Sequence, residues 1–413
     1  MLNKSKKIYI SEWTKVKTYE IKRKYGVEKI DERDFDFVSQ LDRQGKISIK
    51  QLSNGIELES YSYVGVIKLT NFQIIIMPKI EKIQLARMIS FAYNLDSIHL
   101  YEDSTNITYE TGLISDIFAA LFVKEVEKIM QKGLSQRYKE REEQLSSCRG
   151  KILFNRLARN SSLGLTLPCR YQELTTDIVE NRIILSSLKQ LFVWVNTPAL
   201  KRKISILIEK LSSKITYGPL SISLLNKVKH ESNRLTSHYN TLIELAEILL
   251  KSLDFDLTVG KRNFISFLLD MNLLFEKFLY KYMIKSTDST INIKYQNSLI
   301  NKFISQNGGQ HKLIPDYKFY RNNMLVSIAD AKYKNYNYKR ISSGDLYQLT
   351  VYAIANMEQI NEIYLFYPSD KEFQERKYHL NNMITQEPIK IVAKGLPISW
   401  MLNNLGSNYL RFC

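Results

Sequence analysis

The sequence predicts a multi-domain α+β protein, with a β-rich N-terminal domain, a helical middle region and a C-terminal α/β domain that has a mixed sheet. Its 413 residues exceed the size of one ordinary domain. Short apolar runs separated by turns fill residues 1–80, whereas apolar residues recur at steps of three and four over 180–254. From residue 257 onward, helical and strand-like segments alternate, which is typical of an α/β unit.

The N-terminal domain is expected to span residues 1–155. Two apolar runs, Val64–Ile67 and Phe72–Met77, flank a Thr-Asn turn and predict a β-hairpin. The pattern becomes helical over 83–133. The next segment, Ser135–Gln144, is highly charged, and we interpret it as a solvated linker or an exposed helix end.

The helical middle region is expected to span residues 156–256 and the C-terminal domain residues 257–413. Apolar stripes in the middle region are typical of a bundle core rather than of a cofactor pocket. In the C-terminal domain we predict a helix over Phe264–Ile284, a strand over Met324–Ala331 and a second helix over Asp345–Met357.

The chain is strongly basic, with a formal net charge of +17. A fold does not need this imbalance. It does favour binding to a polyanion, because each Lys or Arg placed at a phosphate releases condensed counterions. Charge therefore points to a nucleic acid as a partner. A generally basic surface with no nucleic-acid role remains an alternative that charge alone does not remove.

The three cysteines, Cys148, Cys169 and Cys413, lie far apart, and none belongs to a C-x-x-C pair. They do not provide a four-thiolate zinc site or a full disulfide framework. The basic start of the chain lacks the apolar stretch of a signal peptide, and no run of about eighteen apolar residues occurs. We therefore expect a cytoplasmic protein that does not span a membrane.

The chemistry-bearing residues gather in the segment from Leu313 to Lys334. If its two strands form a hairpin that turns near Asn323, Asp316 and Asp330 are equidistant from the turn and face one another. Asp330 and Lys332 are two residues apart on one strand, so their side chains share a face of the sheet.

Two carboxylates forced together in an apolar sheet repel one another, and a divalent cation relieves this conflict. Mg²⁺ prefers a few carboxylate oxygens and keeps several waters. A metal-held water near the Lys332 ammonium is a plausible nucleophile, and the metal neutralises charge on a phosphate. Asp316, Asp330 and Lys332 thus predict phosphodiester cleavage. An ordinary hairpin with solvated charges is the alternative, since these spacings also arise by chance.

Two further residues are candidates for accessory roles. Glu276 lies within an apolar helical stretch and is expected to reach the sheet as an additional metal ligand. An exposed Glu beside Lys277 is the alternative. Gln348 lies early in the helix after the second strand, where its amide is placed to orient the metal-bound water or to contact a phosphate. A solvated Gln on the outer helix face is the alternative.

The segment from Lys332 to Arg340 interleaves basic and aromatic residues. We predict that it grips the DNA backbone and stacks on sugars or bases. A solvated basic loop is the competing interpretation. The residues expected to bind DNA are Lys334, Tyr336, Lys339 and Arg340.

With these residues in order, the C-terminal part resembles the PD-(D/E)xK nuclease superfamily, and the whole chain resembles the McrC family, the nuclease subunits of McrBC-type modification-dependent restriction systems. The resemblance covers most of the chain in the family's order. The segments that carry it beyond the catalytic triplet are Gly65–Ile80, Gly133–Ile152, Cys169–Leu185 and Phe267–Leu279.

The resemblance implies Mg²⁺-dependent hydrolysis of foreign, methylcytosine-containing double-stranded DNA. In the family, the residues that match Asp316, Asp330 and Lys332 form the active site, and Glu276 and Gln348 match accessory positions. It also implies a partner, a McrB-like hexameric AAA+ GTPase, whose central channel receives the N-terminal part of McrC-like proteins. The docked McrC-like protein stimulates the hydrolysis of GTP.

This sequence contains no G-x-x-x-x-G-K-[ST] loop, so we expect GTP to be bound by the partner and not by this chain. Two other functions stay open. One is a non-catalytic adaptor or GTPase activator, in which the nuclease fold is structural. The other is a stand-alone PD-(D/E)xK DNA repair nuclease, which the long N-terminal and helical regions disfavour.

Overall fold

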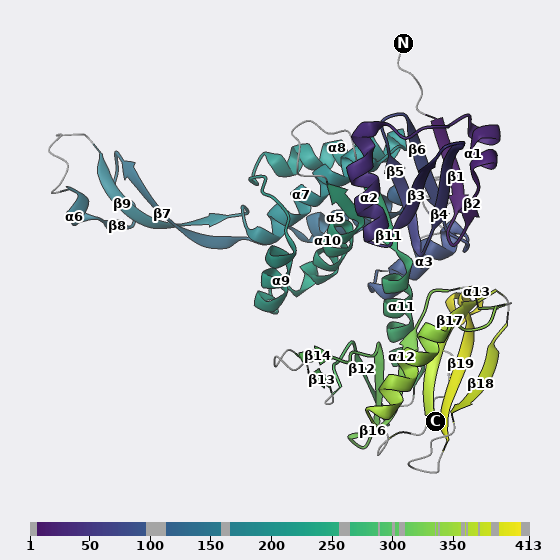
Figure 1. Cartoon of the computed structure of the whole chain (residues 1–413). Coiled ribbons are helices and arrows are strands. Elements are labelled where there is room, and N and C mark those ends of the chain that lie inside the picture. Colours follow the sequence, from purple (N-terminus) through teal and green to yellow (C-terminus); the bar gives the residue numbers. More distant parts are fainter. Residues whose placement is uncertain are drawn as a thin grey trace. The chain divides into compact units, whose positions relative to one another are not determined.

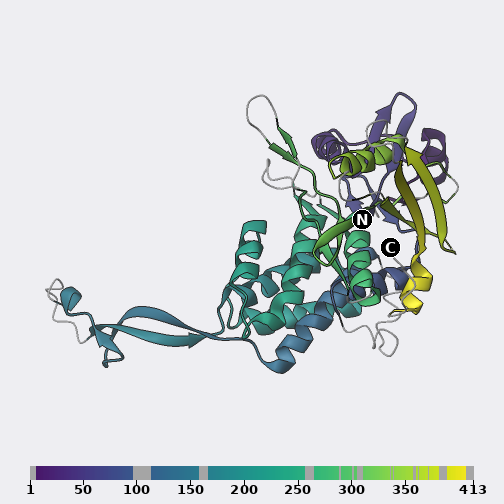
Figure 2. The same ribbon diagram turned by 90° about the horizontal axis from the view of Figure 1, so that it is seen from below.

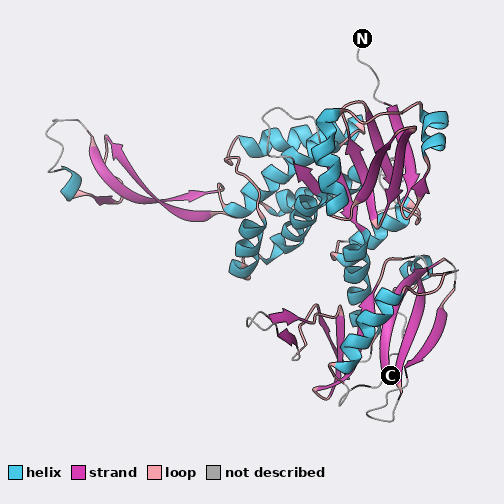
Figure 3. Cartoon of the chain, in the orientation of Figure 1, coloured by secondary structure: helices cyan, strands magenta, loops and turns pink. Residues whose placement is uncertain are grey.

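The protein is mixed α/β and divides into two compact units (Figures 1 and 3). The first unit joins Met1–Ile117 with Ser252–Cys413, and the second is Phe118–Lys251. The computed structural model describes residues 6–95, 113–157, 166–255 and 265–405, except for 288–289, 300–301, 305–309, 335, 338, 357–359, 361, 371 and 381–387.

The N-terminal sheet of the first unit has five strands in the order β1-β6-β5-β11-β10. The β5–β6 hairpin confirms the hairpin predicted around the Thr-Asn turn. Strand β1 pairs with β6 in parallel, and the other pairs are antiparallel. The strands are β1 (Lys6–Ser11), β5 (Tyr63–Lys68), β6 (Phe72–Met77), β10 (Leu253–Phe255) and β11 (Ile265–Asp270).

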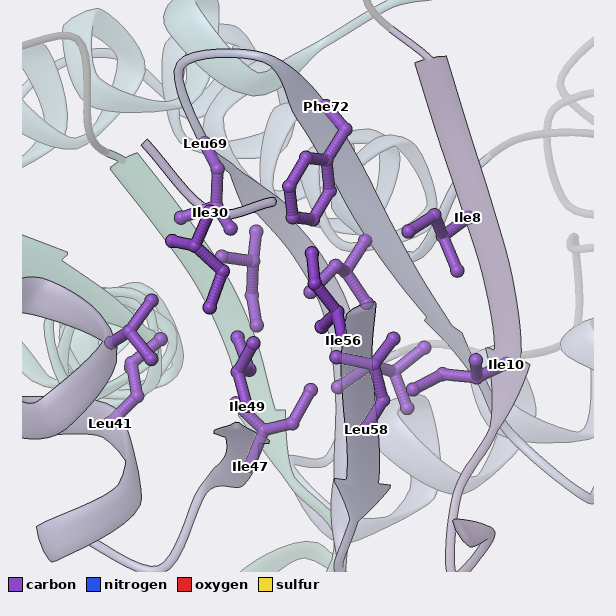
Figure 4. Close-up of a cluster of buried hydrophobic side chains, with 14 of the residues drawn as sticks. Ile8, Ile10, Ile30, Leu41, Ile47, Ile49, Ile56, Leu58, Leu69 and Phe72 are labelled. Carbon is purple, nitrogen blue, oxygen red and sulfur yellow. The ribbon is translucent and has the colours of Figure 1, made fainter. Parts of the chain in front are cut away.

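A second, three-stranded sheet packs against this one through an aliphatic core (Figure 4). Its order is β2-β4-β3, and Ile56 and Leu58 of β4 are buried beside Ile8 and Phe72. Buried residues alternate with exposed residues along β1 and with half-buried residues along β4, which gives each sheet its apolar inner face. The elements are β2 (Lys15–Val16), α1 (Thr18–Tyr25), η1 (Glu32–Asp34), α2 (Phe35–Arg43), β3 (Ile47–Leu52) and β4 (Gly55–Ser60).

The helix predicted over Phe264–Ile284 is wrong at its start. Residues Ile265–Asp270 form β11, and the helix α11 begins only at Met271 and ends at Ser286. Strand β11 pairs with β5, where Gly65 lets the two backbones approach: a Cβ there would lie 1.9 Å from the carbonyl oxygen of Phe267. The Asp270 carboxylate caps α11 by accepting a hydrogen bond from the Asn272 amide.

The C-terminal sheet of the first unit has six strands in the order β12-β15-β16-β17-β19-β18. Strands β16, β17 and β19 run parallel, whereas β12, β15 and β18 join them antiparallel, so the sheet is mixed as predicted. The strands are β12 (Ile291–Tyr295), β15 (Tyr317–Arg321), β16 (Met324–Ala331), β17 (Glu362–Ser369), β18 (Gln374–Leu380) and β19 (Ile389–Pro397).

Helices pack against the sheets of the first unit and against one another. Helix α12 (Ser343–Ile354) packs against β16, β17 and β19, and buries Leu349 and Tyr352 in the core of the C-terminal sheet. Helix α11 packs against α3 (Lys82–Ala92) through the rings of Phe91 and Phe278, whose centres are 5.5 Å apart. The remaining elements are the pair β13 (Lys302–Ile304) and β14 (Gln310–Lys312), and α13 (Ile398–Asn403).

The second unit is a helical bundle, which agrees with the apolar stripes of the middle region. Trp194, Leu188 and Leu245 are among its buried side chains. Among the described residues, no helix is both long and apolar enough to cross a membrane. The helices are α5 (Ile114–Lys132), α7 (Val179–Trp194), α8 (Pro198–Ser212), α9 (Ile222–Glu231), η3 (Ser237–Tyr239) and α10 (Asn240–Ser252).

A long β-arm extends from this bundle (Figures 1 and 2). It consists of β7 (Arg137–Leu145), β8 (Lys151–Ile152), α6 (Phe154–Leu157) and β9 (Leu167–Thr175), and we call it the arm. The interpretation of Ser135–Gln144 as a linker or helix end is therefore wrong, since most of it is β7. Cross-strand ion pairs, such as Arg141 with Glu173 at 2.5 Å, match the charges of β7 to those of β9.

Candidate active site

The β15–β16 hairpin turns through Asn322 and Asn323, whose φ angles are +50° and +64°. Positive φ at both central residues favours Asn and gives a tight two-residue turn. A bulge follows in β16, where Val326 is an extra residue without a partner in β15. The flanking pairs are Tyr320 with Leu325 before the bulge and Phe319 with Ser327 after it.

The bulge decides which residue lies opposite Asp316. Because Tyr317 pairs with Ala329, the next position on each strand brings Asp316 beside Asp330. The backbone amide of Ala331 donates a hydrogen bond of 2.7 Å to Asp316 Oδ2. The structure therefore brings the two aspartates together at the end of β16.

Lys332 follows directly and completes the cluster. Its Nζ lies 2.5 Å from Asp330 Oδ2, and its backbone amide donates to the carbonyl of Phe366 in β17 at 2.8 Å. Asp330 is only 2% exposed, while 22% of the Lys332 side chain is exposed. Burial disfavours the charged ammonium, but the neighbouring Asp330 carboxylate outweighs it and the pKa of Lys332 is raised.

Glu276 of α11 lies near the aspartates. Its Oε2 accepts a hydrogen bond of 3.1 Å from Gln296 Nε2, and its backbone carbonyl accepts one of 2.8 Å from the Tyr317 hydroxyl. Burial, together with the charges of Asp330 and Asp270, raises the pKa of Glu276 to about 7. The carboxyl is thus held in an environment that resists its ionisation.

The same repulsion acts on the aspartates. Burial and the charges of Asp330 and Glu276 raise the pKa of Asp316 to about 9, and burial also raises the pKa of Asp330. Lys332 supplies only one positive charge, which does not compensate three carboxylates. The three acids therefore cannot all be ionised near neutral pH. Their carboxylate oxygens are the ligands that Mg²⁺ prefers.

Gln348 of α12 reaches the site through Tyr352. Its Nε2 donates a hydrogen bond of 2.8 Å to the Tyr352 hydroxyl, which in turn donates to the carbonyl of Ile314 at 3.2 Å. Ile314 lies two residues before Asp316. The amide of Gln348 is therefore connected to the segment that leads to Asp316, rather than solvated on the outer face of the helix.

A known protein family matches most of this chain, including the site. The model of a family described as "McrBC 5-methylcytosine restriction system component" matches residues 58–368. The chain belongs to this family. The matched span holds all five residues of the candidate site, and the resemblance to the McrBC restriction system is confirmed.

A solved structure from the McrBC system has a similar fold. It is described as a refined half-complex from a tetradecameric assembly of Thermococcus gammatolerans McrB AAA+ hexamers with bound McrC, and it matches with a TM-score of 0.58 and 20% identity over 95% of this chain and 94% of that chain. The cryo-EM structure of the Thermococcus gammatolerans McrBC complex matches with a TM-score of 0.48 and 21% identity, over 68% and 88%. No curated protein sequence matches the chain.

The basic loop of this McrBC family member differs from the interpretation of its sequence. Lys334 Nζ forms an ion pair with the buried Asp345 at 2.8 Å, and the Tyr336 hydroxyl donates to the same carboxylate. Tyr336 is 5% exposed, so its ring is not presented for stacking on DNA. Lys339 and Arg340 are exposed, as a role in binding DNA requires.

Sequence reasoning missed the residues that hold this loop. Arg376 of β18 donates hydrogen bonds of 2.8 Å to the carbonyls of Tyr336, Asn337 and Lys339. The carboxylate of Asp345 accepts hydrogen bonds from Lys334, from Tyr336 and from the hydroxyl of Ser342, which caps α12. The spacing Ser342-x-x-Asp345 was the sequence signal for this cap, because a Ser followed three residues later by an acid is typical of a helix start.

The residues of the site fit a magnesium ion by the chemistry of their oxygens. Asp316 and Asp330 supply hard carboxylate ligands, and their raised pKa values mean that a cation would favour both charged forms. In the described part of the chain, however, no three His, Cys, Asp or Glu side chains already converge as a metal cage. The fit therefore rests on the two aspartates, with Glu276 as an accessory group.

Proposed function

We propose that this chain is the endonuclease subunit of a GTP-dependent restriction complex, and that it hydrolyses phosphodiester bonds in DNA with Mg²⁺. The observation that carries the proposal is the convergence of Asp316, Asp330 and Lys332 at the end of one hairpin. Buried acids with raised pKa values beside a lysine are typical of catalytic sites.

Each residue has a role that follows from its contacts. Asp316 and Asp330 would hold the metal, which polarises a phosphate and supplies a nucleophilic water when bound. The Ala331 amide fixes the direction of the Asp316 carboxylate. Lys332, held by Asp330 and partly exposed, presents its ammonium to the phosphate oxygens and stabilises their charge.

Glu276 and Gln348 support the same chemistry from two helices. Glu276 has a carboxyl pKa of about 7, so it is suited to take up a proton near neutral pH. Gln348 fixes the Tyr352 hydroxyl, and through it the segment that leads to Asp316. Lys339 and Arg340 are exposed cations of the loop that would contact the DNA backbone.

The proposed substrate is double-stranded DNA that contains methylcytosine. The family description names 5-methylcytosine, and the net charge of +17 favours a polyanion. Recognition of the modified base is assigned to the partner, because the proposed roles of the candidate site in this chain all act on a phosphate.

The proposed partner is a McrB-like hexameric AAA+ GTPase. The similar structure is described as McrB AAA+ hexamers with bound McrC, and the sequence of this chain has no P-loop of its own for GTP. The arm supports this proposal, because a narrow polar β-ribbon is suited to enter the channel of a ring. Tyr138 and Phe154 of the arm are 69% and 68% exposed and would bury apolar surface there.

The test is a cleavage assay on a methylated plasmid with the partner, GTP and Mg²⁺. The wild-type chain should cut, and Asp330→Ala should abolish cutting while it still assembles with the partner. Equal cutting by the variant would remove Asp330 from the site. Intact DNA with wild-type protein, alongside stimulated GTP hydrolysis, would instead support a non-catalytic activator. Cutting by the isolated chain would support a stand-alone nuclease.

A further inference from the structure

Tyr333 links the loop that carries Lys332 to the N-terminal sheet. It follows Lys332 directly in the chain, and its hydroxyl donates a hydrogen bond of 3.0 Å to Glu12 Oε1. Both side chains are buried, with 4% of Tyr333 and none of Glu12 exposed. The two residues are far apart in sequence, so this bond joins two separate parts of the fold.

Glu12 is held firmly on its side of the bond. Its backbone amide donates to the carbonyl of Met77 at the end of β6, at 3.0 Å. Its Oε1 also accepts a hydrogen bond of 2.7 Å from the backbone amide of Lys79. The end of β6 and the residues after it therefore fix the position of the acceptor that Tyr333 uses.

A tight backbone turn connects Tyr333 to Lys332. The Lys334 amide donates to the Lys332 carbonyl at 2.8 Å, so the backbone makes a three-residue turn with Tyr333 at its centre. On the other side, the Lys332 amide bonds to the carbonyl of Phe366. A rotation of Tyr333 would thus move the Lys332 backbone relative to Asp330.

Tyr333 packs against a helix and also lines a cavity. Its ring meets Phe275 of α11 edge-on, with ring centres 5.8 Å apart. A cavity of about 290 Å³ is lined by Glu12, Tyr333 and Asn337 among others. Because of this open space, the loop has room to shift when the hydrogen bond is lost.

Glu276 is tied to the same sheet by a separate route. It follows Phe275 in α11, and α11 continues directly from β11 of the N-terminal sheet (Figure 1). The Met271 amide donates to the Ser62 carbonyl at 2.9 Å, and Asn272 Nδ2 donates to Ser62 Oγ at 2.7 Å. The N-terminal sheet thus supports both Lys332 and Glu276 through their neighbours in the chain.

We propose that Glu12 and Tyr333 are positioning residues, through which the N-terminal sheet holds Lys332 in its place beside Asp330. This inference rests on the proposed function of the site. The position of the loop that carries Lys332 would then depend on a sheet that contributes no side chain to the proposed active site.

The experiment compares Tyr333→Phe with Tyr367→Phe as the matched control. Tyr367 is also buried, and its hydroxyl also bonds to one side chain, Gln374, in the C-terminal sheet. Each variant loses one hydroxyl and keeps its ring. Glu12→Ala removes the acceptor, whereas Glu12→Gln keeps an oxygen that both Lys79 and Tyr333 can reach, and it should restore the wild-type behaviour.

The first readout is hydrogen exchange in residues 331–334 of the full chain, without DNA or metal. Tyr333→Phe and Glu12→Ala should exchange faster there, while Tyr367→Phe and Glu12→Gln should match the wild type. The second readout is the single-turnover cutting rate of the complex beside its affinity for DNA. The rate should fall roughly tenfold to a hundredfold with unchanged affinity, as expected for a misplaced group.

The two readouts distinguish a failure of the proposed nuclease function from a failure of the positioning role. If the wild-type complex fails to cut DNA, the proposed function is wrong, but exchange still tests the link between Tyr333 and the loop. If exchange in Tyr333→Phe equals that of the wild type, the positioning role is overturned. Equal cutting rates for Tyr333→Phe and Tyr367→Phe would overturn it as well.

Discussion

Asp316 faces Asp330 across the β15–β16 hairpin because β16 holds one residue more than β15 between the turn and the aspartates. If Val326 were paired and the bulge were absent, continuous pairing from the Asn322-Asn323 turn would set Asp316 opposite Ala329. Asp330 would then point to the other face of the sheet, since successive residues alternate. The bulge therefore absorbs the extra residue of β16 and keeps the two carboxylates opposite one another.

Deletion of Val326 should leave DNA cutting close to the wild-type level. The deletion removes only the residue that has no partner in β15, so Phe319 still pairs with Ser327, Tyr317 still pairs with Ala329, and Asp316 still faces Asp330 in a ladder without a bulge. The measurements are plasmid cleavage by the complex and circular dichroism of the chain. Val326→Ala is the control, because it keeps the bulge and shortens only a half-buried side chain, and it should cut. A deletion variant that folds but does not cut would contradict this account of the register.

The metal-free chain should lose stability as pH rises, and Asp316→Asn should remove part of this loss. The pKa of Asp316 is raised from its usual 3.8 to about 9, so between these values the folded chain holds a proton that the unfolded chain has released. The folded state then binds more protons, and the free energy of unfolding falls with rising pH across this window.

The comparison is made by urea unfolding in a metal chelator at pH 5 and pH 8. Asp316→Asn should be more stable than the wild type at pH 8, by at least about 1 kcal/mol, the free energy of one pKa unit. Added Mg²⁺ should stabilise the wild type and not this variant. Asp36→Asn, at an exposed position in α2, should change neither result. An equal change in stability from pH 5 to pH 8 in the wild type and in Asp316→Asn would oppose the assignment.

Lys332→Met should slow cutting by roughly a hundredfold to a thousandfold, the usual effect of removing one group that stabilises transition-state charge. DNA affinity should change little, because one cation among many is removed. The measurements are the single-turnover rate and the dissociation constant for DNA. Lys377→Met removes an exposed lysine from β18 and should retain the wild-type rate. A drop in affinity that matches the drop in rate would assign Lys332 to binding instead.

The cations of the basic loop should separate into two groups. Replacement of Lys339 and Arg340 by Ala should weaken DNA binding and reduce its dependence on salt, by about 0.9 in slope for each phosphate that is no longer neutralised. Lys334→Ala should instead lower stability by about 1–3 kcal/mol, because it leaves the buried Asp345 carboxylate without its cation. Binding isotherms at several salt concentrations and thermal unfolding distinguish the two effects.

The sequence allowed the pairing of the two aspartates to be predicted, but not the reason for it. Counting from Asn323 makes Asp316 and Asp330 equidistant, yet the turn lies between Asn322 and Asn323, and the bulge at Val326 compensates. No Gly or Pro marks that bulge, so the local sequence contains no signal for it. The symmetric count and the bulged hairpin happen to give the same neighbours.

Other errors arose where a distant partner decides the local structure. Residues Ile265–Asp270 are apolar enough for a helix or a strand, and their pairing with β5 selects the strand. The charged β7 is stabilised by β9, a strand with matching charges that comes later in the chain. Lys334 and Tyr336 fit a DNA-binding pattern, and in the fold both of them contact the carboxylate of Asp345.

The N-terminal sheet contains β10 and β11, which come from residues 253–255 and 265–270, after the whole helical unit. A ribosome must therefore release most of the chain before this sheet can acquire its last two strands. Until then the edge of β5 has no partner and offers its backbone to any other strand. The helical unit can therefore fold during synthesis while the sheet is still incomplete. The sheet is completed only after β10 and β11 have been synthesised.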